Sequence, residues 1–147
     1  MRNLLRRGRT ERGAALLEMA LTLPLLLLVC VGILEFGRAY QTWQVLTNAV
    51  REGARVAVLP GVDDAAVQDR VQSYMTSGQL PSANLATIAI DRNRSISIGA
   101  GTTSASQVTV NYPFEFMVLE QIARLVTGTS GSNALNMAAS ATMRNEM

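Results

Sequence analysis

Residues 12–34 read RGAALLEMALTLPLLLLVCVGIL, an apolar run that is interrupted by a single acid, Glu18. From Ala14 to Leu34 the run covers 21 residues, which would form a helix about 31 Å long. A hydrocarbon core is about 30 Å thick, so the segment is predicted to cross a membrane once. A carboxylate there is unfavourable by about 2.5–3.5 kcal/mol, which makes Glu18 a candidate functional residue. A protonated or snorkelling Glu18 is the structural alternative.

The charges on either side of this run predict its orientation. Residues 1–13 carry five arginines and one acid, whereas the rest of the chain carries eight arginines and ten acids. Basic flanks stay on the cytoplasmic side, so we expect a cytoplasmic leader (1–13), a transmembrane helix (14–34) and an exported remainder. The basic cluster belongs to a short leader and not to a folded surface, which argues against nucleic-acid binding.

The inventory of reactive side chains argues against catalysis. The chain contains no histidine, and its single cysteine, Cys30, lies inside the apolar run. The commonest general base and the commonest metal ligand are therefore absent. Asp63, Asp64 and Asp69 are better explained as cap and first-turn acids of a helix than as a calcium site. We expect no catalytic, cofactor-binding or metal site and no small-molecule substrate.

The helix is predicted to continue beyond the membrane as an amphipathic extension (35–59). One stripe at spacings of three and four comprises Phe36, Tyr40, Trp43, Leu46, Val50, Ala54 and Ala57. Polar residues, Glu35 among them, are expected on the other faces. Tyr40 and Trp43 are the expected interface anchors, because tyrosine and tryptophan collect at membrane surfaces. Pro60-Gly61 is predicted to end the helix.

The remaining residues (60–147) predict a small exported domain. A helix capped by Asp63 or Asp64 is expected to run to about Met75. Alternation predicts strands at 87–91 and 95–98 joined by a turn at 92–94, and a strand at 107–112 that stops at Pro113. A loop is expected at 99–106, a short helix at 117–126, another loop at 127–133 and a last strand from Leu135 to Met143. The fold class is therefore α+β, with a long helix followed by a small domain containing a short antiparallel sheet.

Four motifs in order resemble the TadE-like family of bacterial tight-adherence (Flp, type IVb) pilus systems. They are RGAALLE at 12–18, LPLL at 23–26, EFGR at 35–38 and NAVREGAR at 48–55. The resemblance is dense over residues 12–58 and thins beyond Leu59. It implies a pilin-like fold and a bacterial inner-membrane protein with a cytoplasmic N-terminus and a periplasmic C-terminal domain. It leaves the related TadE and TadF roles open.

The resemblance also implies a function and partners. A pseudopilin, a minor pilin-like subunit, is cut by a prepilin peptidase. Here the cut would fall between Gly13 and Ala14, and Glu18 would pair with the new amino terminus of a neighbouring subunit. Met19 stands where relatives often carry an aromatic residue. Other pilin-like subunits and the pilus assembly platform are the expected partners. The alternative is an uncleaved, membrane-anchored assembly factor of the same machinery.

Overall fold

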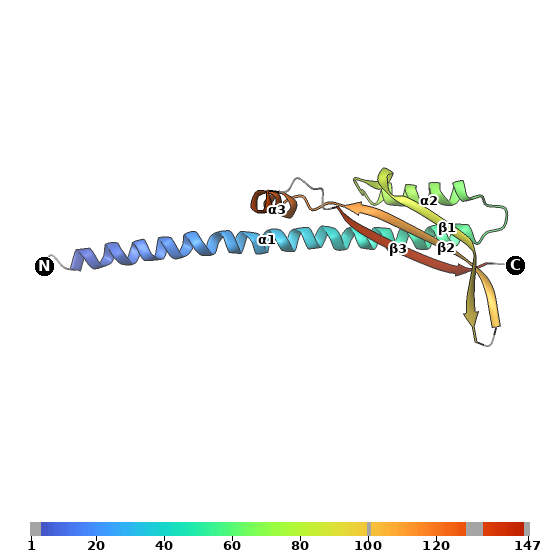
Figure 1. The fold of residues 1–147 in the computed structure, drawn as a ribbon, viewed down its shortest axis with the longest axis horizontal. Helices are drawn as coiled ribbons and strands as arrows, with labels where there is room; N and C mark the ends of the chain where they lie inside the picture. Colours follow the sequence, from blue (N-terminus) through green and yellow to red (C-terminus); the bar gives the residue numbers. More distant parts are fainter. Residues whose placement is uncertain (1–3, 100, 129–133, 146–147) are drawn as a thin grey trace.

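The computed structural model describes residues 4–99, 101–128 and 134–145, which form a long helix with a small sheet domain on its C-terminal half (Figure 1). The elements in chain order are α1 (Leu4–Ala57), α2 (Asp64–Ser77), the 3₁₀ turn η1 (Ala83–Leu85), β1 (Thr87–Ile98), β2 (Gly101–Phe114), α3 (Leu119–Thr127) and β3 (Leu135–Arg144). The strands form an antiparallel sheet in the order β1-β2-β3. The predicted α+β class, with its long apolar helix and antiparallel sheet, is confirmed.

From Gly13 to Cys30, α1 has no tertiary cover. Every residue from Gly13 to Cys30 is exposed, and the helix continues through Pro24. A core helix of a soluble protein would be mostly buried, yet the apolar window here is 0% buried. Among the described residues, α1 is the one helix whose length and composition allow it to cross a membrane. Its length, composition and exposure are those of a single-pass membrane anchor.

The C-terminal half of α1 forms the centre of the core. The buried side consists of Leu46, Ala49, Val50, Gly53, Ala54 and Ala57. It packs against Val67, Val71 and Met75 of α2 and against Val108, Val110, Tyr112 and Phe114 of β2. Alternate residues of β2 point to the helices, which is the side-chain period of a strand. α1 and α2 thus form one layer and the sheet forms the other.

The predicted stripe of α1 is only half right. Leu46, Val50, Ala54 and Ala57 are buried as expected, whereas Phe36, Tyr40 and Trp43 are exposed. Near the membrane the packed side instead contains Glu35 and Thr42, which are both buried. A helix turns about 100° per residue, so these two residues lie to one side of the aromatic row. The prediction that Glu35 lies on a polar face is therefore wrong.

The predicted turn at 92–94 is also wrong, because β1 is one strand with a register shift between Asp91 and Arg94. Arg92 turns toward the end of α1, where Nη1 donates to the Ala57 carbonyl (2.9 Å) and Nε to Asp64 Oδ1 (2.6 Å). Asp91 Oδ1 accepts a bond from the Asn93 amide (3.0 Å), a local contact that turns and bulges share. The bulge therefore caps α1 and places α2 beside it.

Both predicted ends of the second strand differ from those in the structure, where β2 runs from Gly101 to Phe114. The expected loop at 99–106 is mostly strand, because the chain reverses at Gly99, whose φ of +61° favours glycine, and β2 already begins at Gly101. Pro113 lies inside β2 and does not end it. β1 begins opposite Asn111, so Pro113 pairs only with Asn136 of β3 and its missing N–H disturbs no second ladder.

Other local predictions are confirmed. Asp63 caps α2 by accepting a bond from the Ala66 amide (2.9 Å). The short helix near 117–126 is α3, and the last strand is β3. On β3 the predicted face is buried or half-buried from Met137 to Met143, whereas Leu135 is exposed. Most of the predicted loop at 127–133 lies outside the described residues.

An ion pair between the two helices makes stability depend on pH. Arg70 donates from Nη2 (2.7 Å) and Nε (3.2 Å) to Glu52 Oε1. The Arg70 hydrogen bond lowers the pKa of Glu52 from its ordinary value of 4.5; burial partly opposes this, and the Arg55 charge adds to the lowering. A depressed folded pKa adds stability above the unfolded pKa, and this stability is lost as the pH falls through the folded value.

We therefore expect Glu52→Gln to destabilise the protein at pH 7 by less than about 1 kcal/mol, because the pair is partly exposed. The difference from wild type should shrink as the pH falls below 4.5. Thermal unfolding in detergent, followed by circular dichroism from pH 7 to pH 3, measures it. Asp69→Asn removes an exposed carboxylate of α2 and is the control. A Glu52→Gln deficit that is independent of pH would contradict the prediction.

Candidate functional site

The predicted cleavage and pairing residues lie together on the uncovered part of α1. Gly13, Ala14 and Glu18 are exposed, and a Cβ added at Gly13 would meet nothing within 4 Å. Glu18 follows Ala14 by one helical turn, so the two lie on the same side of α1. The Gly13–Ala14 peptide is helical here. A glycine lowers helix stability by about 1 kcal/mol relative to alanine, which favours local opening at this bond.

Glu18 is the charged residue of the apolar run. Thr22, a polar neighbour, is satisfied within the helix, because its Oγ1 donates to the Glu18 carbonyl (3.0 Å). Among the side chains that the structure describes, no cation lies within ion-pair distance of the Glu18 carboxylate. A carboxylate at this depth needs a partner from outside the described chain, or a proton.

A second polar centre, which the sequence reasoning missed, lies where the apolar run ends. The side chain of Glu35 is 4% exposed, and its two carboxylate oxygens have different partners. Oε1 accepts from the Val118 amide (2.6 Å), and Oε2 accepts from Arg38 Nη1 (2.7 Å). The sequence signal was the Glu35–Arg38 spacing, which indicates a helix pair but does not reveal the contact with Val118.

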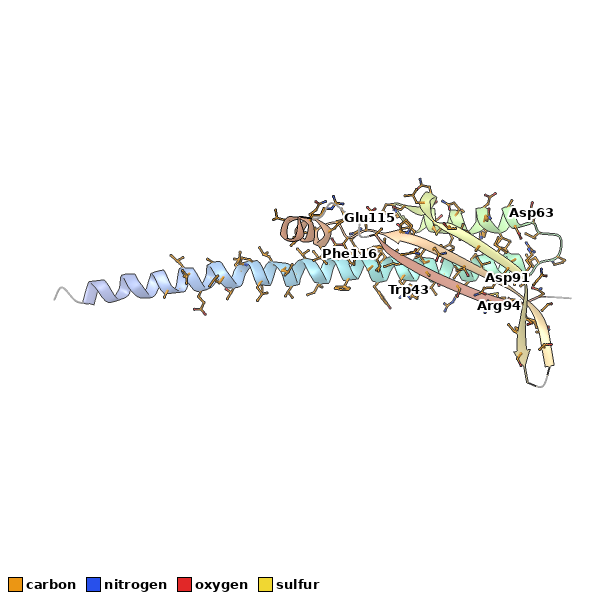
Figure 2. All side chains as sticks on the ribbon, in the orientation of Figure 1. Trp43, Asp63, Asp91, Arg94, Glu115 and Phe116 are labelled. Atoms are coloured by element: carbon orange, nitrogen blue, oxygen red, sulfur yellow. The ribbon has the colours of Figure 1, made fainter. Side chains whose placement is uncertain are left out.

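Aromatic rings surround the Glu35 junction, which consists of Glu35, Arg38 and Val118. The Arg38 guanidinium lies 5.5 Å from the centroid of the Phe114 ring, within the range of a cation–π contact. Phe116 packs edge-on against Phe114 (5.2 Å between centroids) and Phe36 (6.4 Å). Figure 2 shows Phe116 and Glu115 in the segment that leads from the sheet to α3. The junction thus joins the membrane end of α1 to the end of β2.

Glu35 acts as the cap of α3. Val118, at the cap position of α3, has no side chain that could accept a backbone N–H, and no side-chain cap bond is present. The Glu35 carboxylate binds the Val118 amide instead and places negative charge at a helix N-terminus, where it is favourable. The position of α3 is therefore set by a residue of α1.

We expect Glu35→Leu to release α3 from α1. The change removes the carboxylate acceptor of the Val118 amide, and a hydrogen bond to a charged group contributes about 1.5–3 kcal/mol. Hydrogen exchange of the amides from 117 to 127 should become faster, whereas the amides of α2 should keep wild-type rates. Glu115→Gln, at an exposed carboxylate of the same segment, is the control. Unchanged exchange in Glu35→Leu would show that α3 is held by other contacts.

Tyr40 and Trp43, the predicted interface anchors, lie just beyond this junction. Both are exposed, and Tyr40 Oη accepts a bond from Gln44 Nε2 (2.8 Å). Trp43 is on the outer surface of α1, next to the sheet domain (Figure 2). Two of the acids considered for a calcium site have other partners. Asp63 caps α2, and Asp64 forms an ion pair with Arg92 of β1. No group of three or more histidine, cysteine or acidic side chains gathers at one point of the described chain.

A comparison with protein-family models finds the TadE-like protein family, matched over residues 13–55. Over this stretch, the TadE-like segment, the chain is similar to TadE-like proteins. The TadE-like segment runs from Gly13 through the exposed and the buried halves of α1 and includes Glu18 and Glu35. Neither the curated proteins nor the solved structures contain a match to this chain. The match lies within α1 and leaves residues 56–147 uncovered.

Proposed function

We propose that this protein is a minor pseudopilin that acts in assembly of a tight-adherence pilus, after a prepilin peptidase has cut it between Gly13 and Ala14. The observation that carries the proposal is the shape of α1. Its apolar run from Ala14 to Leu34 bears one carboxylate and is uncovered up to Cys30, while its C-terminal half carries the sheet domain (Figure 1). A helix of this kind buries its apolar surface in lipid or against identical helices.

The cut would create the partner that Glu18 lacks. A new α-amino group at Ala14 has an ordinary pKa of about 7.7–8.0, so it is cationic near neutral pH. When helices pack side by side, the Glu18 carboxylate of one subunit reaches the Ala14 amine of the next. Pairing lowers the cost of burying both charges and selects one stagger between the helices.

Orientation and partners follow from the same arrangement. The five arginines of the leader keep it in the cytoplasm, so the domain from 60 to 147 is exported to the periplasmic side of the inner membrane. Tyr40 and Trp43 anchor α1 at the outer interface. The partners are the prepilin peptidase, other pilin-like subunits and the pilus assembly platform.

The second candidate is an uncleaved, single-pass assembly factor of the same machinery. The observation in its favour is that α1 passes through Gly13 and Ala14 as a regular helix, whereas a peptidase needs an accessible, extended peptide. On this alternative the leader remains in place and the Ala14 amine never forms. Glu18 then has to find a different partner.

The deciding experiment measures the N-terminus and intact mass of the membrane-purified protein, expressed with and without its prepilin peptidase. A chain that begins at Ala14 only when the peptidase is present supports the pseudopilin. Gly13→Val should block the cut, whereas Gly8→Val, at another leader glycine, should not. A chain that keeps the leader in the presence of active peptidase overturns the pseudopilin and leaves the uncleaved factor.

A further inference from the structure

α3 lies apart from the rest of the sheet domain. Figure 1 shows it beside α1, displaced from the sheet toward the N-terminal half of that helix. The Glu35–Val118 bond and the Phe36–Phe116 ring contact place its start at the end of the apolar run. Next to this point Val31 and Gly32 are half-buried, whereas the apolar run before them is exposed throughout. α3 therefore lies at the level where α1 leaves the membrane.

α3 has one apolar and one charged side. Val118, Ile122 and Leu125 follow one another at spacings of four and three, so they share a side of the helix. All three are exposed, and Leu125 is 87% exposed. Glu120 and Arg124 form an ion pair on the opposite side. Within the described residues, no part of the sheet domain covers Leu125, although leucine is among the residues most often buried.

We infer that α3 is an interfacial helix whose apolar side enters the outer leaflet of the membrane that α1 crosses. A helix with a charged side and an apolar side lies in the plane of the interface with its apolar side buried among the acyl chains. Exposed apolar residues of α1 reach the level of α3, because Ile33, Leu34 and Phe36 flank Glu35 in the sequence and Phe36 contacts Phe116. Exposed Met117 extends it.

A lipid occupant fits this surface because of its place in the molecule. Glu35 fixes α3 to the one helix that crosses the membrane, so α3 cannot leave the interface without breaking that bond. Tyr40 and Trp43 mark the same interface on α1. The protein then has two membrane contacts, the span and α3, which together set the depth and tilt of the sheet domain. This inference rests on the transmembrane placement of α1 in the proposed function.

The test uses full-length protein in phosphatidylcholine vesicles with single spin labels. Cys30, in the apolar run, reports on the span, and the other positions are made in a Cys30→Ser background. Leu125→Cys tests the apolar side of α3, Arg124→Cys is the adjacent control on the charged side, and Gln68→Cys on α2 is the aqueous reference. Power saturation compares collisions with oxygen, which concentrates in hydrocarbon, and with a water-soluble nickel chelate.

The inference predicts that labels at 125 and at Cys30 favour oxygen, and that labels at 124 and 68 favour nickel. The oxygen-to-nickel ratio at 125 should fall several-fold toward that at 124 when Glu35→Leu is added. A label at 125 that favours nickel while Cys30 favours oxygen overturns the interfacial helix and keeps the membrane anchor. A label at 125 that is shielded from both reagents indicates a protein partner and also overturns it. Nickel access at Cys30 would overturn the transmembrane placement itself.

Discussion

Replacing Glu18 by leucine is expected to abolish pilus assembly while the protein still inserts into the membrane. The leucine removes the only acid from the apolar run of 14–34, so insertion becomes more favourable by about 2.5–3.5 kcal/mol. In the proposed pseudopilin, however, the amine at Ala14 would lose its partner, and an unpaired buried charge costs about 3–5 kcal/mol. Electron microscopy of pili and an adherence assay measure the effect.

The control for this experiment lies on the other side of the proposed cut. Glu11 belongs to the leader and would leave with it, so Glu11→Gln should preserve piliation. Glu18→Gln keeps the shape of the side chain without its charge and should behave like Glu18→Leu. Normal piliation and adherence in Glu18→Leu would refute the pairing of Glu18 with the amino terminus. An uncleaved anchor predicts that outcome.

The second large effect is expected at Gly53, where α1, α2 and β2 meet. A Cβ at Gly53 would overlap Val71 Cγ2 and would lie 3.4 Å from Val108 Cγ1. Both valines are fully buried, and a β-branched side chain has little freedom to turn away. Overpacking of this kind costs about 1–3 kcal/mol, against a gain of about 1 kcal/mol in helix propensity. Gly53→Ala should therefore lower the unfolding temperature, and Gly53→Leu should prevent the domain from folding.

Gly37 is the matched control in the same helix. A Cβ there meets nothing within 4 Å, so Gly37→Ala should raise the unfolding temperature slightly. Adding Val71→Ala to Gly53→Ala should recover part of the loss, because neighbouring substitutions that relieve one clash are not additive. Equal stabilisation by Gly53→Ala and Gly37→Ala would mean that the helices are not in close contact at Gly53.

Prediction from the sequence worked best where the cause lies within a few residues. The cap of α2 at Asp63 and the alternation of β3 are local signals, and both are present in the structure. It failed at residues 92–94, because the same Asx contact serves a turn or a bulge and only the neighbouring strand decides between them. It failed again at Pro113, whose place inside a strand depends on where β1 begins.

The candidate site also contains residues that local sequence patterns reveal and one that they do not. Glu18 is a candidate from the sequence alone, because a charge in an apolar run is visible without any tertiary information, whereas Gly13 and Ala14 are candidates through the family resemblance. Glu35 was assigned to a polar face, because a carboxylate beside an arginine is usually solvated. Its burial requires Val118, which is 83 residues away in the chain.

The amino-acid sequence alone determined the length of the apolar run, the charge asymmetry around it and the periods of most helices and strands. These properties depend on hydrophobicity and backbone preference, which act over one or two turns of chain. The tertiary structure decided which side of α1 is packed, that Arg92 caps it and that α3 lies beside its membrane end. Those outcomes depend on buried polar groups finding partners 35 and 83 residues away. A buried donor or acceptor must be satisfied wherever the fold brings a partner, and no local pattern records that partner.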